Sequence, residues 1–285
     1  MKKTLVSILT VILTAGLVSA QDIAQVTESF NKAAEALNAG DRAAALTGFV
    51  EVLPQAEVLG AEGNDIVAQC KNLIPSLYVS VAKAFVKNGE SGKAIEALEN
   101  AIKTGGEYGD SQTVAEAGDL MGSLKVSEAV KNASEMAKSQ DFDGAAALLS
   151  GSLEGASEAN AAVIRKQLSN IYLRKASACF KAKDMKTALE SAQKSIENGD
   201  NANAQKIAGH SALALKQYKI AADAYEAYLA MSPNAKDKVQ IMYQAGSAYQ
   251  SLGDAAKACG YFKEISQDPK WGEGARYQMT VLKCN

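Results

Sequence analysis

The chain has 285 residues, with 30 basic and 32 acidic side chains and 47% hydrophobic residues. This apolar content is sufficient for a substantial core, and the near balance of charge leaves no basic stripe that would favour nucleic acid. Only 6% of the residues are aromatic and four are proline, so the composition favours close-packed helices over sheets and argues against a disordered chain.

Residues 1–20 predict a secretory signal peptide. Two lysines follow the initiator methionine, an apolar run extends from Leu5 to Leu17, and small residues lead to Ala20, where signal peptidase would cut. The alternative is an uncleaved membrane anchor, for which the run is short. No cysteine follows the run, which disfavours a lipoprotein. We expect residues 21–285 to be periplasmic or secreted, without an integral membrane span.

From about residue 23 onward, hydrophobic residues recur at intervals of three and four, which predicts amphipathic helices. Short polar breaks divide the helices into pairs. Gly40, Gly89 and Gly253 stand where a first helix must end, because glycine adopts the left-handed conformation at low cost. An Asp after the break can cap the second helix. We therefore predict hairpins that turn beside Asp41, Glu90, Asp141, Asp184, Gln217 and Asp254.

An internal repeat supports this division. The segment 76–102 matches the segment 170–196 without a gap, at an offset of 94 residues, and apolar positions coincide on both sides of the turn. Self-similarity of this kind indicates a solenoid of stacked units. Pro75, just before the first copy, is expected in the first turn of a helix, with a kink inside a longer helix as the alternative.

The last two pairs show the fullest pattern, from about residue 203 to residue 269. A small residue precedes an aromatic one by three positions, then come Gly-Asp, Ala, an aromatic residue and Pro. In the final copy these are Gly246, Tyr249, Gly253, Asp254, Ala258, Phe262 and Pro269. This pattern resembles the tetratricopeptide repeat. The resemblance implies an all-α, right-handed superhelical α-solenoid of about six helical hairpins, with small residues at helix crossings such as Ala82 with Ala94.

The early units depart from the family's spacing. The second-helix alanines are separated by 49, 51, 43, 33 and 37 residues, against about 34 in the family; they are Ala45, Ala94, Ala145, Ala188, Ala221 and Ala258. We expect one domain over residues 21–285, with long, irregular repeats at about 23–200 and regular repeats at about 201–270. The extra residues would extend the first helices. A capping helix at about 272–284 would follow, with Trp271 packed at its start.

Four cysteines are present, at Cys70, Cys179, Cys259 and Cys284. In an exported protein Cys259 and Cys284 are the plausible disulfide, which would tie the C-terminal tail to the last hairpin. The alternative is four small buried residues. Their spacing does not indicate a zinc site.

No catalytic, metal or cofactor site is indicated, since His210 is the single histidine and no triad can be assembled around it. The resemblance implies a groove of first-helix side chains that holds a peptide or a partner's helix. Carried over by position, the groove would include Lys83, Lys87, Arg174, Ser177, Lys206, His210, Tyr243, Ser247, Gln250 and Ser251. The alternative is that these side chains are simply solvated.

One version of the family's groove clamps a carboxylate with Lys and Asn. Asn203 and Lys206 match part of that set, but His210 stands where an Asn would be, so capture of a C-terminal carboxylate is not expected. We predict a non-enzymatic, exported scaffold or adaptor that binds a protein or peptide, with no nucleic acid. The alternatives are a cell-envelope assembly factor, for the outer membrane or division, and a small-ligand-binding protein or hydrolase.

Overall fold

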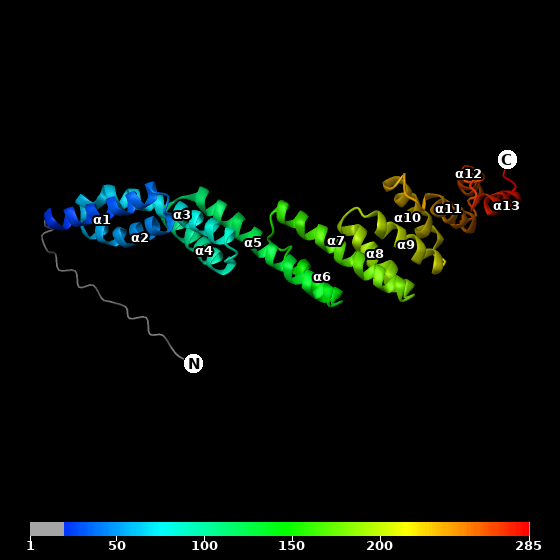
Figure 1. Ribbon diagram of the computed structural model, residues 1–285, viewed down its shortest axis with the longest axis horizontal. Helices are drawn as coiled ribbons and strands as arrows, with labels where there is room; N and C mark the ends of the chain where they lie inside the picture. The colour runs from blue at the N-terminus through cyan, green and yellow to red at the C-terminus, as the bar shows by residue number, and fades with distance from the viewer. Residues whose placement is uncertain (1–19, 285) are drawn as a thin grey trace, which may run out of the picture. The chain divides into compact units, whose positions relative to one another are not determined.

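The computed structural model describes residues 20–284 (Figure 1). Over that range the chain forms thirteen α-helices and one short 3₁₀ helix, with no strand, so the all-α prediction is confirmed. The predicted signal peptide lies outside the described residues, apart from Ala20, which begins the first helix. None of the helices in this range is both long enough and apolar enough to cross a membrane.

The helices form six consecutive hairpins and a final single helix. The first three hairpins are α1 (Ala20–Asn38) with α2 (Arg42–Val58), α3 (Asn64–Lys87) with α4 (Ser91–Tyr108), and α5 (Ser111–Lys138) with α6 (Phe142–Gly151). The next three are α7 (Glu158–Lys181) with α8 (Met185–Asn198), α9 (Ala202–Ala214) with α10 (Tyr218–Met231), and α11 (Lys238–Leu252) with α12 (Ala255–Glu264). The 3₁₀ helix η1 (Gly60–Gly63) precedes α3, and α13 (Gly272–Leu282) ends the chain.

All six turns lie at the predicted positions. Four second helices begin after an Asp whose carboxylate accepts a hydrogen bond from the backbone N–H three residues later, at 2.9–3.1 Å. These caps are Asp41, Asp141, Asp184 and Asp254. Glu90 and Gln217 also precede second helices, without a side-chain cap bond. Local capping chemistry therefore sets the hairpin register.

The backbone just before each cap is left-handed. Gly40, Gly89 and Gly253 have φ values of +85°, +78° and +82°. The other three turns place non-glycine residues in the same region, with φ of +68° at Gln140, +62° at Lys183 and +58° at Lys216. A side chain in this region carries a conformational cost that glycine avoids.

The 94-residue repeat is visible in the helix bounds, because α7 and α8 begin 94 residues after α3 and α4. The long first helices are also confirmed: α3, α5 and α7 have 24, 28 and 24 residues, against 13 and 15 in α9 and α11. The first-turn prediction for Pro75 is wrong. The helix extends back to Asn64, so Pro75 lies buried in its interior, where it removes one backbone hydrogen bond.

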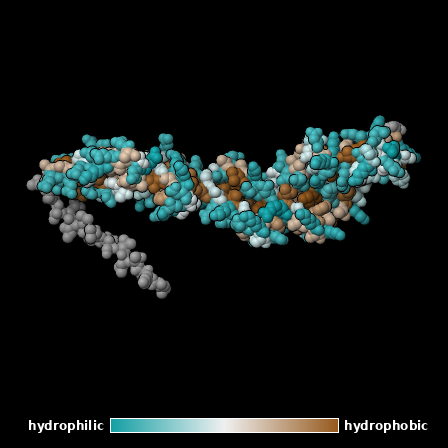
Figure 2. Space-filling model, viewed as in Figure 1, coloured by the Kyte–Doolittle hydropathy of each residue, from teal (hydrophilic) through white to brown (hydrophobic). Residues whose placement is uncertain are grey.

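The contacts divide the chain into two compact units, which meet in sequence inside α5, between Leu124 and Lys125. Each unit has its own buried apolar residues, with Phe49 and Ile74 in the first and Ile164 and Tyr225 in the second. The single-domain expectation for residues 21–285 stays a prediction. Figure 2 shows hydrophilic residues over most of the visible face, with smaller patches of hydrophobic residues among them.

The C-terminal helix α13 covers the last hairpin, as expected for a cap. Trp271 is its N-cap residue and packs on Tyr243, with ring centroids 5.1 Å apart. Arg276 donates to the carbonyl oxygen of Ser266. A disulfide joins Cys259 of α12 to Cys284, with a Cα–Cα distance of 5.6 Å. Cys70 and Cys179 are free, and Cys70 is buried.

Candidate functional site

The candidate site is an open pocket of about 530 Å³ in the second unit, here called the His210 pocket. Its apolar lining comes from α7, α8 and α9 and consists of Phe180, Met185, Leu213 and Ala214. Its polar lining comes from α9 and α11 and consists of His210, Gln240 and Gln244. Three first helices of consecutive hairpins thus contribute to one hollow.

Gly209 and Tyr225 place the histidine. A Cβ on Gly209 would lie only 2.6 Å from Cε1 of Tyr225, so the absence of a side chain lets the Tyr225 ring pack against α9. That ring is fully buried. Its hydroxyl lies 2.9 Å from Nδ1 of His210, and the two ring centroids are 5.5 Å apart. Small-residue packing between α9 and α10 therefore holds His210 at the pocket.

The hydrogen bond from Tyr225 assigns the histidine tautomer. Burial raises the pKa of Tyr225, so its phenol keeps the proton. A buried O–H needs an acceptor, and His210 Nδ1 is its one partner among residues 20–284. The phenol therefore donates to Nδ1, and in the neutral ring the proton sits on Nε2. Nε2 bonds to no described group, so it carries a free N–H donor on a residue that lines the pocket.

His210 is held in its neutral form. Burial lowers its pKa below the usual value, and the positive charge of Lys206 lowers it further, while Asp237 acts in the opposite direction. An imidazole with a lowered pKa is uncharged at neutral pH. The pocket therefore presents a neutral donor at His210 rather than a cation.

Gln244 contributes an acceptor that nothing in the described chain satisfies. Its Oε1 is buried and lacks a hydrogen-bond partner, a condition shared only with Ser211 Oγ among the side-chain atoms of residues 20–284. A buried polar atom without a partner costs about 1–3 kcal/mol. A ligand with an N–H group would recover part of this free energy.

Lys206, one turn before His210, is not available as a free cation. Its Nζ donates to Oδ2 of Asp237 at 2.9 Å and lies 5.2 Å from the centre of the Tyr228 ring. Tyr228 Oη donates to the other oxygen of Asp237 at 2.6 Å. Burial opposes ionisation of Asp237, but these two hydrogen bonds lower its pKa on balance. The two charges compensate each other beside the pocket.

The other groove candidates from the sequence lie elsewhere. Lys83 in the first unit pairs with Glu116 at 2.7 Å, and Lys87 is exposed. In the second unit, Arg174 donates to the carbonyl oxygen of Ala137 at 2.8 Å, and Ser177 is half-buried.

Four further candidates on α11 are engaged with their neighbours. Ser247 Oγ donates to the carbonyl oxygen of Tyr243 at 2.9 Å, and Gln250 Nε2 donates to Gln278 of α13 at 2.9 Å. Tyr243 packs between Phe262 and Trp271. Ser251 Oγ donates to the carbonyl oxygen of Ser247 at 3.0 Å. Of the ten groove candidates, His210 lines the pocket.

Sequence reasoning missed Phe180, Gln240 and Gln244. One available signal was helical spacing: Gln240 and Gln244 are four residues apart, so their amides share one face of α11. They lie 30 and 34 residues after His210 in the chain. Their approach to His210 depends on how the hairpins stack, which periodicity alone does not specify.

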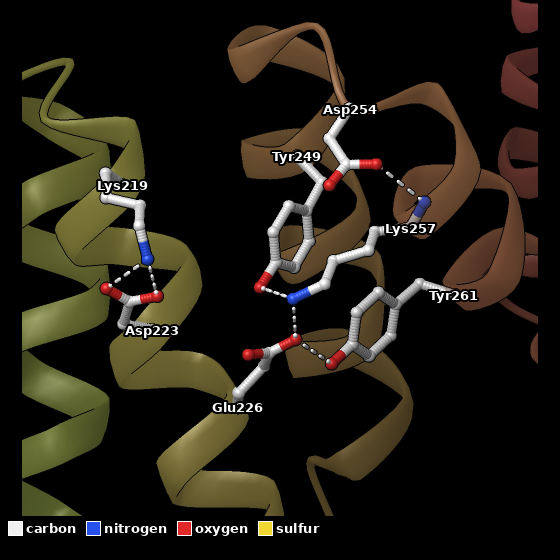
Figure 3. A network of polar contacts seen from close by, with 7 residues as sticks. All are labelled: Lys219, Asp223, Glu226, Tyr249, Asp254, Lys257 and Tyr261. Carbon is white, nitrogen blue, oxygen red and sulfur yellow. Dashed lines mark hydrogen bonds and ion pairs between the residues drawn. The ribbon is translucent and has the colours of Figure 1, made fainter.

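A second polar cluster joins hairpins without lining the pocket (Figure 3). Lys257 of α12 donates to Tyr249 Oη at 2.8 Å and to Glu226 of α10 at 3.3 Å. Tyr261 Oη also donates to Glu226 at 3.3 Å, and its ring stacks on Tyr249 with a centroid distance of 6.0 Å. This cluster links α10, α11 and α12, and therefore helps to fix α11 and its two pocket glutamines.

Within residues 20–284, no group of three or more His, Cys, Asp or Glu side chains is arranged to hold a metal ion. The pocket contains one titratable side chain, His210. The arrangement offers a bound group one neutral donor, one unsatisfied acceptor and apolar walls.

Comparisons with known proteins give one family match and a set of similar solved structures. The tetratricopeptide repeat profile matches residues 239–265. Similar solved structures include MamA from Desulfovibrio magneticus RS-1, at 16% identity over 68% of this chain and 97% of that one, with a TM-score of 0.31. They also include YrrB, at 14% identity over 70% and 91% with a TM-score of 0.34, and the P58(IPK) TPR domain, at 19% over 91% and 64% with a TM-score of 0.35.

No curated protein matches the chain. The matched residues 239–265 coincide with the hairpin α11–α12, which carries the small, aromatic and Gly-Asp pattern seen in the sequence. We conclude that this hairpin is a tetratricopeptide repeat, the last of six helical hairpins in the described residues.

Proposed function

We propose that this protein is an exported scaffold that binds a protein partner at the His210 pocket. Tetratricopeptide hairpins are protein-interaction modules, which supports the general class of function. The observation that carries the proposal is the pocket itself, whose lining combines apolar side chains with His210 of α9, whose Nε2 has no described partner, and Gln244 of α11, whose buried Oε1 has none. Such a combination of apolar lining and a few convergent polar groups is typical of a binding site.

Export is part of the proposal and has two sources of support. The first twenty residues have the composition of a signal peptide. The bond between Cys259 and Cys284 belongs to the kind of crosslink that persists in oxidising compartments. Sequencing the N-terminus of the mature protein tests this part: a chain that starts at Gln21 supports export, and a cytoplasmic chain that retains the apolar run contradicts it.

Site-specific photo-crosslinking tests the binding role. A photoreactive amino acid replaces Gln240, which lines the pocket, and in a matched variant it replaces Gln193 on α8, which does not. In cells that make the chain, we expect a discrete adduct from position 240 and not from position 193. Equal adducts at both positions, or none at position 240, would contradict binding at this pocket.

A further inference from the structure

We infer that the His210 pocket selects an uncharged peptide amide beside an apolar side chain, and discriminates against free carboxylate and free amino termini. This inference rests on the proposed function and specifies the partner's chemistry: an internal, extended segment of a protein, rather than its end.

The apolar walls favour a hydrophobic side chain. Phe180, Met185 and Leu213 come from three different helices and supply much of the apolar lining of this open pocket. The volume of about 530 Å³ lies within the range of roughly 300–1,000 Å³ found for small-ligand sites. It accommodates one large side chain together with the backbone that carries it.

The two polar groups have opposite hydrogen-bonding character. His210 Nε2–H can donate, because Tyr225 occupies Nδ1 at 2.9 Å. Gln244 Oε1 can accept, because it has no partner among the described residues. This oxygen is covered, so it must turn toward an incoming N–H. A peptide amide carries both an acceptor and a donor, whereas a carboxylate offers only acceptors and an ammonium group only donors.

Charge also distinguishes a peptide amide from a carboxylate and from an ammonium group. No Lys, Arg, Asp or Glu lines the pocket, and the neighbouring Lys206 and Asp237 are bonded to each other at 2.9 Å. A charged terminus that entered would lose its hydration and meet no free counter-charge, which is costly in an apolar site. A neutral amide avoids that cost.

Three leucine derivatives that share one side chain test the selectivity. They are N-acetyl-L-leucine methylamide, which is neutral, N-acetyl-L-leucine, which is a carboxylate at pH 7, and L-leucine methylamide, which is cationic. Binding to the purified chain is followed through the ring resonances of His210, the one histidine of the sequence. We expect the neutral probe to bind about fivefold more tightly than either charged probe, as one net hydrogen bond of about 1 kcal/mol would give.

Variants separate the polar pair from the apolar walls. Gln244→Met keeps the size of the side chain and should remove the preference for the neutral probe, while Gln193→Met, outside the pocket, should retain it. His210→Phe should act like Gln244→Met; its binding is followed through the leucine methyl signals of the probe. Thermal unfolding shows whether each variant is folded, so a loss of selectivity in a folded protein is interpretable.

The outcomes distinguish this inference from the proposed function. Tighter binding of the carboxylate, equal binding of all three probes, or unchanged selectivity in a folded Gln244→Met protein would overturn the inference. A crosslinked partner from position 240 would still support the scaffold role in that case. Conversely, selective binding of the neutral probe without any crosslinked partner would support the inference about the pocket and contradict the scaffold role.

Discussion

Replacing Gly209 by Ala tests the close approach that positions His210. The new Cβ would lie 2.6 Å from Cε1 and 2.7 Å from Cδ1 of Tyr225, and this ring is fully buried. Alanine gains up to about 1 kcal/mol over glycine in a helix, but overpacking a core costs about 1–3 kcal/mol. Because the clash involves a ring with no free space, we expect overpacking to prevail, with a net loss of about 1–2 kcal/mol.

Gly260→Ala is the matched control. Gly260 lies in α12, and a Cβ there would have nothing within 4 Å, so only the helix-propensity term applies and stability should rise by up to about 1 kcal/mol. Urea unfolding followed by circular dichroism measures both variants against the parent. If Gly209→Ala and Gly260→Ala stabilise the protein equally, the argument that Gly209 exists to admit the Tyr225 ring is refuted.

Three further predictions concern charge, backbone and covalent structure. NMR titration of His210 should give a pKa below 6.5, and unfolding free energy should fall as pH drops below about 6.5, because the unfolded chain takes up the proton first. Lys216→Gly, at φ +58°, should stabilise by about 1 kcal/mol in urea unfolding, whereas Gly253→Ala, at φ +82°, should destabilise. Cys259→Ser with Cys284→Ser opens a crosslink of 25 residues and should cost about 3 kcal/mol in urea unfolding.

Each of these has an outcome that would contradict it. A pKa of His210 at or above 6.5 would mean that burial and Lys206 do not govern the ring. A loss of stability in Lys216→Gly would mean that interactions of the lysine side chain stabilise the turn before α10 by more than the conformational cost of its left-handed backbone. Equal stability of the oxidised parent and the double serine variant would show that a native-state cost of the crosslink offsets the entropy that it removes from the unfolded chain.

The hairpin order could be predicted from the sequence because its determinants are local. Asp41 and Asp254 cap the helix that begins at the next residue, and Gly253 sits in the left-handed turn just before. These interactions span a few residues, so their signature survives in the linear sequence. The length of α3 was also predictable, since the extra residues of the early units continue the helical periodicity.

The pocket could be predicted only in part, because its groups meet through tertiary packing. From its position in the repeat, Lys206 is expected to be a free cation in the groove. In the structure its ammonium group donates to Asp237, which lies 31 residues later in the chain. Gln244 stands out by a buried oxygen that lacks a partner, and sequence patterns do not record missing hydrogen bonds. Pro75 lies in the interior of α3, because the residues that extend the helix back to Asn64 override the preference of proline for a first turn.

The donor at His210 Nε2 supports both the binding site and its selectivity, and the tautomer of this ring can be measured directly. In a long-range ¹H–¹⁵N NMR spectrum at pH 7.5, the ring should be protonated on Nε2 with Nδ1 unprotonated, because Tyr225 donates to Nδ1. A ring protonated on Nδ1, or one charged at that pH, would contradict the account.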